Sequence, residues 1–150
     1  MELQPAPVVP CVVMSGIHVD VSRAPIIVVR FGRTWTDADF DAYLDAMETA
    51  VLSRREATVT ILDAQVAMTT PATQRRKQAA WLEKNEAVLR RYSLGTAFVI
   101  TNPVVRGVLT AILWIQPMAA PHVVVATPRE AERWAAARIA ERHARAPANP

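Results

Sequence analysis

From residue 70 onward, a polar capping residue stands directly before a proline at Thr70-Pro71, Asn102-Pro103 and Thr127-Pro128. Such a pair favours the start of a helix, because the polar side chain accepts a hydrogen bond from an unpaired backbone N–H and proline lacks an N–H where none is needed. Apolar runs with strand composition separate these helix starts. This part of the chain is therefore predicted to alternate strands with helices, which is typical of a parallel sheet with helical crossovers.

The preceding residues add a hairpin and one more helix to this pattern. The apolar runs 17–21 and Ile26–Phe31 flank a Ser-Arg-Ala-Pro turn and predict two antiparallel strands. Thr36 with Asp39 forms a capping sequence before an amphipathic helix with an acidic first turn. We predict an α/β fold with a mixed sheet of about five strands and four helices, in which the later strands lie at 58–62, 95–101 and 122–126 and the later helices at 71–92, Pro103–Ile115 and 129–142.

The length of 150 residues and an apolar content of 51% fit a single globular domain. We expect that domain to span residues 16–143, after a flexible leader at 1–15 and before a flexible tail at 144–150; Met14 is an alternative start. No uncharged apolar run approaches the roughly 20 residues of a membrane-spanning helix, and the amino terminus lacks the positive region of a secretory signal. We therefore expect a cytoplasmic protein with no membrane span.

Composition argues against several classes of function. Cys11 is the only cysteine, so neither an internal disulfide nor a cysteine metal cluster can form. The net charge of +3 is a small excess that comes from arginines alternating with alanines, so we expect no nucleic-acid partner. The sequence has only four glycines and no glycine-rich phosphate loop, and its histidines are not spaced as metal ligands. We expect no cofactor, no metal and no catalysis.

Asp63 is the strongest candidate for an enzymatic role. It ends a predicted central strand, where α/β enzymes often place functional acids. An enzyme that uses Asp63 with His122 is therefore kept as an alternative.

A basic cluster, Arg75-Arg76-Lys77, lies near the start of the helix predicted at 71–92. Cations are disfavoured at that end of a helix by its dipole. The cluster is either a solvated surface or a patch that receives an anion or an acidic partner, since arginine suits bidentate contacts.

The predicted helix Pro103–Ile115 is apolar on nearly all sides, with only Arg106 and Thr110 as a narrow polar strip. Such a helix is either wholly buried or half-buried with an interaction surface. A helix in an α/β layer fold usually covers the sheet with one of its sides only, so we predict an interface on the remaining side of this helix. Its candidate residues are Val104, Arg106, Ala111, Trp114 and Ile115.

The order of the elements, the strand-corner-helix at residues 61–76 and the closing segment HVVVATPREAERWA together resemble a STAS-type domain. This is the fold of bacterial anti-sigma-factor antagonists, and the chain is most similar to its divergent SpoIIAA-like branch. The resemblance implies a Ser or Thr at the corner that a partner kinase phosphorylates. The matching corner holds Thr69 and Thr70 but lacks the Asp-Ser-Ser/Thr-Gly stretch of the family. We expect Thr70 to cap the helix first, and Thr69 or Thr70 to be the phospho-acceptor if one exists.

These observations favour a non-catalytic regulatory module of bacterial signalling that docks to a protein partner or, as a homodimer, to itself. A binding domain for a small apolar or lipid-like ligand is the second hypothesis, and an enzyme with an unrecognised site is the third.

Overall fold

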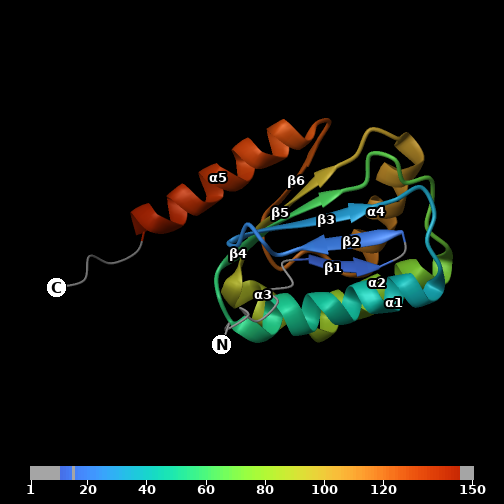
Figure 1. The fold of residues 1–150 in the computed structure, drawn as a ribbon, viewed down its shortest axis with the longest axis horizontal. Coiled ribbons are helices and arrows are strands. Elements are labelled where there is room, and N and C mark those ends of the chain that lie inside the picture. The colour runs from blue at the N-terminus through green and yellow to red at the C-terminus, as the bar shows by residue number, and fades with distance from the viewer. Residues whose placement is uncertain (1–10, 15, 146–150) are drawn as a thin grey trace, which may run out of the picture.

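The structure is a computed structural model that describes residues 11–14 and 16–145. It contains one six-stranded sheet whose strands lie in sequence order (Figure 1). The first three strands are antiparallel, and β3 to β6 are parallel. The strands are β1 (Cys11–Met14), β2 (Ile17–Asp20), β3 (Ile26–Phe31), β4 (Thr58–Asp63), β5 (Ser93–Val99) and β6 (His122–Val125).

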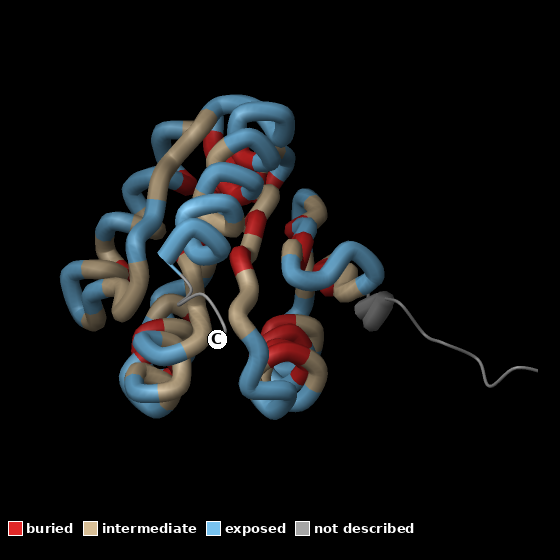
Figure 2. Tube along the Cα trace, turned by 90° about the vertical axis from the view of Figure 1, so that its left-hand side faces the viewer, coloured by how far each residue is buried: buried red, intermediate tan, exposed pale blue. Residues whose placement is uncertain are grey.

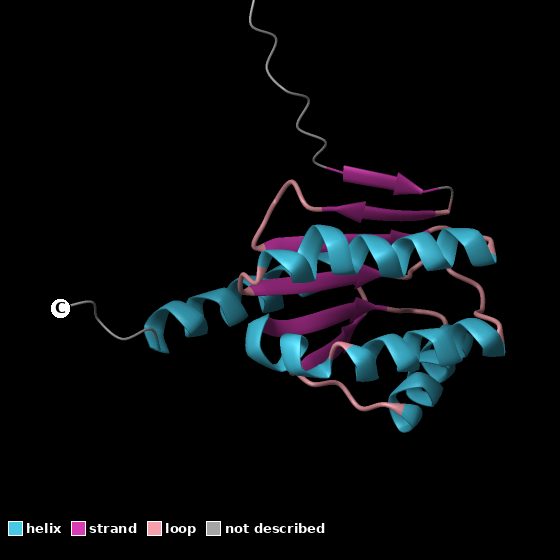
Figure 3. Cartoon of the chain, turned by 90° about the horizontal axis from the view of Figure 1, so that it is seen from below, coloured by secondary structure: helices cyan, strands magenta, loops and turns pink. Residues whose placement is uncertain are grey.

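The helices cover the two sides of the sheet unequally (Figures 1 and 3). Helix α5 packs alone on one side, which we call the α5 face, and the other helices cover the opposite side, which we call the four-helix face. The end of α5 extends beyond the sheet (Figure 1). The helices are α1 (Asp37–Ala46), which continues through the turns Met47–Val51 and Leu52–Arg54, then α2 (Ala72–Lys84), α3 (Glu86–Tyr92), α4 (Pro103–Ile115) and α5 (Pro128–Arg145).

This architecture confirms the α/β class, the mixed sheet and the five predicted strands, and it adds a sixth strand. Residues Cys11–Met14 lie within the predicted flexible leader, yet they pair with β2 as strand β1. Gly16, directly before β2, adopts a positive φ of 89°, which glycine tolerates without steric cost. The rest of the predicted leader, 1–10 and 15, lies outside the described residues, as do 146–150 of the predicted tail.

The helix predicted at 71–92 is two helices, so the described chain has five α-helices and not four. The break falls at Asn85, which lies outside the helical region of the backbone with φ −102° and ψ 12°. Its side-chain amide donates to the carbonyl of Trp81 at 3.0 Å and to the Glu48 carboxylate at 3.2 Å. Asparagine competes in this way with the backbone hydrogen bonds of a helix, so the chain bends where a continuous apolar pattern had predicted none.

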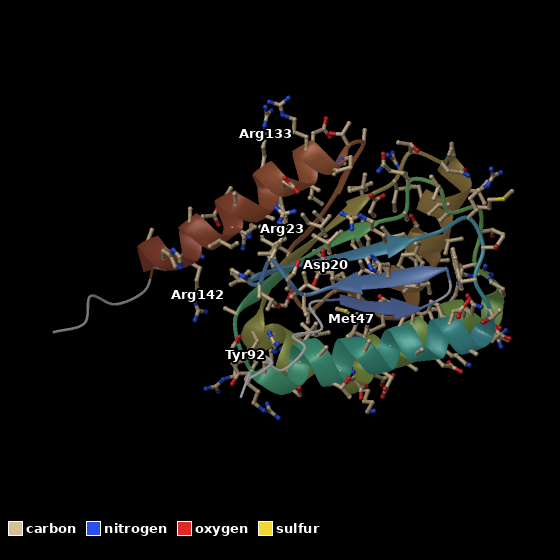
Figure 4. All side chains as sticks on the ribbon, viewed as in Figure 1. Asp20, Arg23, Met47, Tyr92, Arg133 and Arg142 are labelled. Atoms are coloured by element: carbon tan, nitrogen blue, oxygen red, sulfur yellow. The ribbon has the colours of Figure 1, made fainter. Side chains whose placement is uncertain are left out.

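The core lies on both sides of the sheet, and buried residues concentrate along the strands and the inward sides of the helices (Figure 2). Side chains alternate along each strand, so β4 sends Val59 and Ile61 to the α5 face and Thr60 and Leu62 to the four-helix face. Arg23 of the β2–β3 turn is labelled in Figure 4. It ties the hairpin to α5, because its guanidinium donates to Glu132 at 2.8 Å.

Candidate functional site

A cavity of about 140 Å³ lies on the four-helix face, between the sheet and the helices that cover it. Strands β4 and β5 form its floor, and side chains from α1, α2 and α4 form its roof. The lining is mainly aromatic and aliphatic, and it contains no charged residue. Representative lining residues are Tyr43, Met47, Trp81, Leu109 and Ile112 in the roof and Phe98 in the floor.

Hydroxyl groups interrupt the apolar floor on the two central strands. Thr60 of β4 stands in register with Thr96 of β5, and Thr58 stands in register with Ser93. All of them line the cavity, and Thr96 is only 8% exposed. The Ser93 hydroxyl accepts a hydrogen bond from the backbone N–H of Gly95 at 3.3 Å. Hydroxyls on the inward side of two central strands are unusual for a core, which makes this row the polar part of the site.

Tyr43 is part of the same lining, and it is buried against the rings of Phe31 and Phe40. Burial raises the pKa of its phenol well above the ordinary range, so the group is neutral at every physiological pH. The cavity therefore presents no charge from this side chain either.

Two polar networks hold the helices of this face together. Gln74 on α2 is 2% exposed, accepts from the Trp35 indole N–H at 2.7 Å and donates to Asp37 at 2.8 Å. Its amide thus ties the start of α1 to α2. No local pattern indicated this role, since glutamine in a helix usually lies at the surface.

The second network surrounds Glu48. Asn85 and Lys84 donate to its carboxylate and hold the pKa of Glu48 below its ordinary value. The buried indole N–H of Trp81 has no hydrogen-bond partner of normal geometry within the described part of the chain.

The predicted interface on α4 is divided between core and surface. Val105 and Ile112 are buried toward the cavity, and Ala111 is half-buried. On the outer side the exposed fractions are 86% for Trp114, 58% for Val104 and 59% for Ile115, and Arg106 is also exposed. Among the described residues, the other exposed large apolar side chains are Val66 and Met68 in the loop after β4.

The corner after β4 does not work as predicted. Helix α2 begins at Ala72 with Pro71 in the capping position, and no side chain caps it, so the prediction that Thr70 is the helix cap is wrong. The backbone carbonyl of Thr70 instead accepts from Arg75 at 2.6 Å, and its side chain lines the cavity. Proline has moved the start of the helix by one residue beyond the reach of the threonine. Thr69 is exposed.

The basic cluster does not converge on one point. Arg75 bonds the Thr70 carbonyl, and Lys77 forms an ion pair with Asp41 of α1 at 2.8 Å, which raises the pKa of the lysine. Arg76 is exposed on α2. Two of the three side chains thus serve contacts within the chain.

The structure separates the two residues of the enzyme hypothesis. Asp63 is the last residue of β4 and pairs in register with Val99, on the α5 face. His122 is the first residue of β6 and packs edge-on against Phe98, on the four-helix face. They lie at opposite ends and on opposite faces of the sheet. The Asp63 carboxylate accepts from the backbone and side-chain amides of Gln65.

Within residues 11–14 and 16–145, no group of three or more His, Cys, Asp and Glu side chains is placed to hold a metal ion. None of the described helices is long and apolar enough to cross a membrane. Comparison of the chain with protein-family models, with curated proteins and with solved structures finds no match.

Proposed function

We propose that this chain is a non-catalytic interaction module that docks through the outer surface of α4, with a second copy of the chain as its partner. The observation that carries the proposal is the exposure of Trp114, which is 86% accessible on a helix that bears Arg106 as its only charged residue. Exposed apolar surface of this kind usually marks a binding surface, and tryptophan is a favoured anchor.

Gly107 supports pairing of α4 with itself. A Cβ atom placed on Gly107 would meet nothing within 4 Å, so this glycine is not required by packing inside the chain. It lies two helical turns before Trp114 on the same side of the helix. In an antiparallel pair with a two-fold axis between these positions, Trp114 of each copy covers Gly107 of the other.

Such a dimer is small. A stable interface buries roughly 800 Å² on each partner, and one thirteen-residue helix offers only part of that area. We therefore expect dissociation in the micromolar range or weaker, consistent with a reversible regulatory contact. The regulatory role itself rests on the STAS-like, SpoIIAA-like resemblance, in which phosphorylation at the corner with Thr69 and Thr70 controls docking.

Sedimentation equilibrium tests the docking surface. The wild type should dimerise reversibly, and Trp114→Glu should weaken the dimer at least tenfold while the circular dichroism spectrum is retained. Ala137→Glu, an equally polar change at an exposed position of α5, serves as the matched control and should leave dimerisation unchanged. A wild type that stays monomeric to millimolar concentration contradicts self-docking.

Gly107→Ala separates folding from docking. Alanine should raise the stability of the monomer, since glycine inside a helix costs about 1 kcal/mol. The same change should weaken the dimer, because a methyl group fills the space above which Trp114 of the second copy lies. Equal or tighter dimerisation of this variant would contradict the proposed pairing of Trp114 with Gly107.

Phosphorylation is tested separately by mass-spectrometric mapping of Thr69 and Thr70 in protein isolated from its native host, with Arg75, Arg76 and Lys77 as the nearby basic side chains. Modification at either threonine together with altered docking supports the regulatory role. Unmodified threonines under all growth conditions argue against it.

A further inference from the structure

The cavity on the four-helix face has the size of a small-molecule site. Its volume of about 140 Å³ is close to that of an engineered apolar cavity, about 150 Å³, that stays dry and binds benzene. The cavity is bounded by side chains that are far apart in sequence, such as Met47, Trp81 and Phe98. A ligand there would contact α1, α2, α4 and the central strands at once.

The lining excludes a charged ligand. Every side chain around the cavity is uncharged, including Tyr43 with its raised pKa. A carboxylate, phosphate or ammonium group would lose its hydration and meet no opposite charge, which is a large cost. The part of a ligand that enters the cavity must therefore be neutral.

The floor gives the ligand one polar requirement. Thr96 is more than nine-tenths buried, and it lines the cavity beside its register partner Thr60. Among the described residues, neither hydroxyl takes part in a hydrogen bond with the protein. Neither oxygen is among the buried side-chain polar atoms that lack a partner, so both face open space and can bond to a ligand or a water molecule in the cavity.

We propose that this cavity binds a small neutral molecule with a compact aromatic or branched body and a single hydroxyl or carbonyl group, which bonds to Thr60 and Thr96. The body packs between Met47, Trp81 and Ile112. This inference does not depend on docking through α4, because Trp114 points away from the cavity lining.

Three probes of similar size test the chemistry: p-cresol with a hydroxyl group, toluene without one, and benzoate with a charge. The measurement is titration of the full chain by two-dimensional amide NMR. We expect saturable binding of p-cresol, weaker binding of toluene and no binding of benzoate. The amide signals that shift should belong to residues of β4, β5 and α4. Equal binding of benzoate, shifts centred on α5, or no saturable shift with p-cresol would overturn the proposal.

Thr96→Val tests the polar contact, since valine has the same shape as threonine but no hydroxyl. It should weaken p-cresol binding roughly fivefold, as expected for one neutral hydrogen bond, and leave toluene binding unchanged. Thr110→Val is the matched control, because Thr110 is exposed on α4 and does not line the cavity. An equal effect of Thr110→Val, or an unchanged preference for p-cresol over toluene in Thr96→Val, contradicts the assigned hydroxyl.

Leu109→Phe tests the volume by filling part of the cavity from the roof. Binding of both p-cresol and toluene should weaken several-fold, with the amide spectrum of the α5 face retained. Trp114→Glu should leave binding of both probes unchanged, so loss of docking and loss of ligand binding are distinguishable. Undiminished binding in Leu109→Phe overturns the site.

Discussion

The two faces of the sheet are formed by the same strands, but side chains are packed more tightly on one face than on the other. On the α5 face a single helix buries Val59 and Ala131 completely. On the four-helix face several helices leave Thr60 and Leu62, on the same strand, partly exposed beneath them. The cavity of about 140 Å³ lies on that side. Over the central strands, more covering helices have therefore given looser packing.

The difference follows from side-chain size at the contacts. Helix α5 meets the sheet through Ala131 and Ala135, so its backbone lies close to the strands and the space is filled. The opposite layer meets it through Trp81, Phe98 and Met47, whose large side chains hold the helices away from the strands. Bulky side chains from separate elements rarely fill such a space completely, so the hollow lies where they converge.

The largest expected effect concerns Gly95, on the tight face. This glycine has φ +143°, and a Cβ atom there would lie 2.4 Å from the Trp134 ring and 2.7 Å from the Pro121 carbonyl. Gly95→Ala should destabilise the protein by at least 3 kcal/mol, because both the backbone and the packing oppose it. Urea denaturation measures the change. A loss below about 1 kcal/mol would show that α5 yields easily and that the two faces differ less than described.

A pair of enlarging substitutions compares the faces directly. Ala135→Leu should cost about 2–3 kcal/mol, because the buried alanine has no space beside it. Leu109→Phe adds volume next to the cavity and should be neutral or stabilising. Both variants are measured by the same urea denaturation. Equal losses in the two variants would mean that the cavity is not available to a larger side chain.

Gln74 tests how far the looser face depends on polar contacts. Gln74→Ala should cost about 2 kcal/mol, because it removes two hydrogen bonds and leaves the buried Trp35 indole N–H without its acceptor. Gln78→Ala, one turn further along α2 and half-buried, is the control and should cost much less. Similar losses at Gln74 and Gln78 would rule out a special role for the network.

The smallest expected effect is pH-dependent and concerns Glu48. Its pKa lies below the ordinary value of 4.5, so the folded state favours the charged carboxylate. The stabilisation should be present above pH 4.5 and be lost as the pH falls through the lowered folded value. Glu48→Gln should thus cost about 0.5 kcal/mol at neutral pH and nothing in strong acid.

Glu83→Gln, on the exposed side of α2, is the control for Glu48. Thermal denaturation of both variants is followed from pH 7 to pH 2.5. A stability difference between wild type and Glu48→Gln that stays constant across this range would show that the carboxylate is not held charged by Asn85 and Lys84.

Local signals explain which parts of the fold were predictable. The capping box at Thr36 and Asp39 forms as expected, and Asn102 caps α4 with its side chain at 2.9 Å from the N–H of Val104. Helix α4 has the predicted bounds. Strand β1 and the break at Asn85 were missed, because each depends on contacts with another element: pairing with β2 in the first case and the Glu48 carboxylate in the second.

The candidate sites were less predictable than the fold. The outer surface of α4 was visible as excess apolar surface, but its division into buried Ile112 and exposed Trp114 required the position of the neighbouring helices. The threonines of the cavity floor carried no signal, since threonine is common in strands for its shape alone. The predicted pairing of Asp63 with His122 is wrong, because sequence order does not show which face of the sheet a side chain occupies.

The amino-acid sequence by itself determined the order of β2 to β6 with helical segments between the parallel strands, and the starts of α1 and α4, since periodicity and capping involve residues within a few positions of one another. The tertiary structure alone decided which face α5 covers, how far the other helices lie from the sheet, and hence the cavity and its row of hydroxyls. These features depend on the sizes of side chains that meet from distant parts of the chain, such as Trp81 with Phe98 on one face and Gly95 with Trp134 on the other.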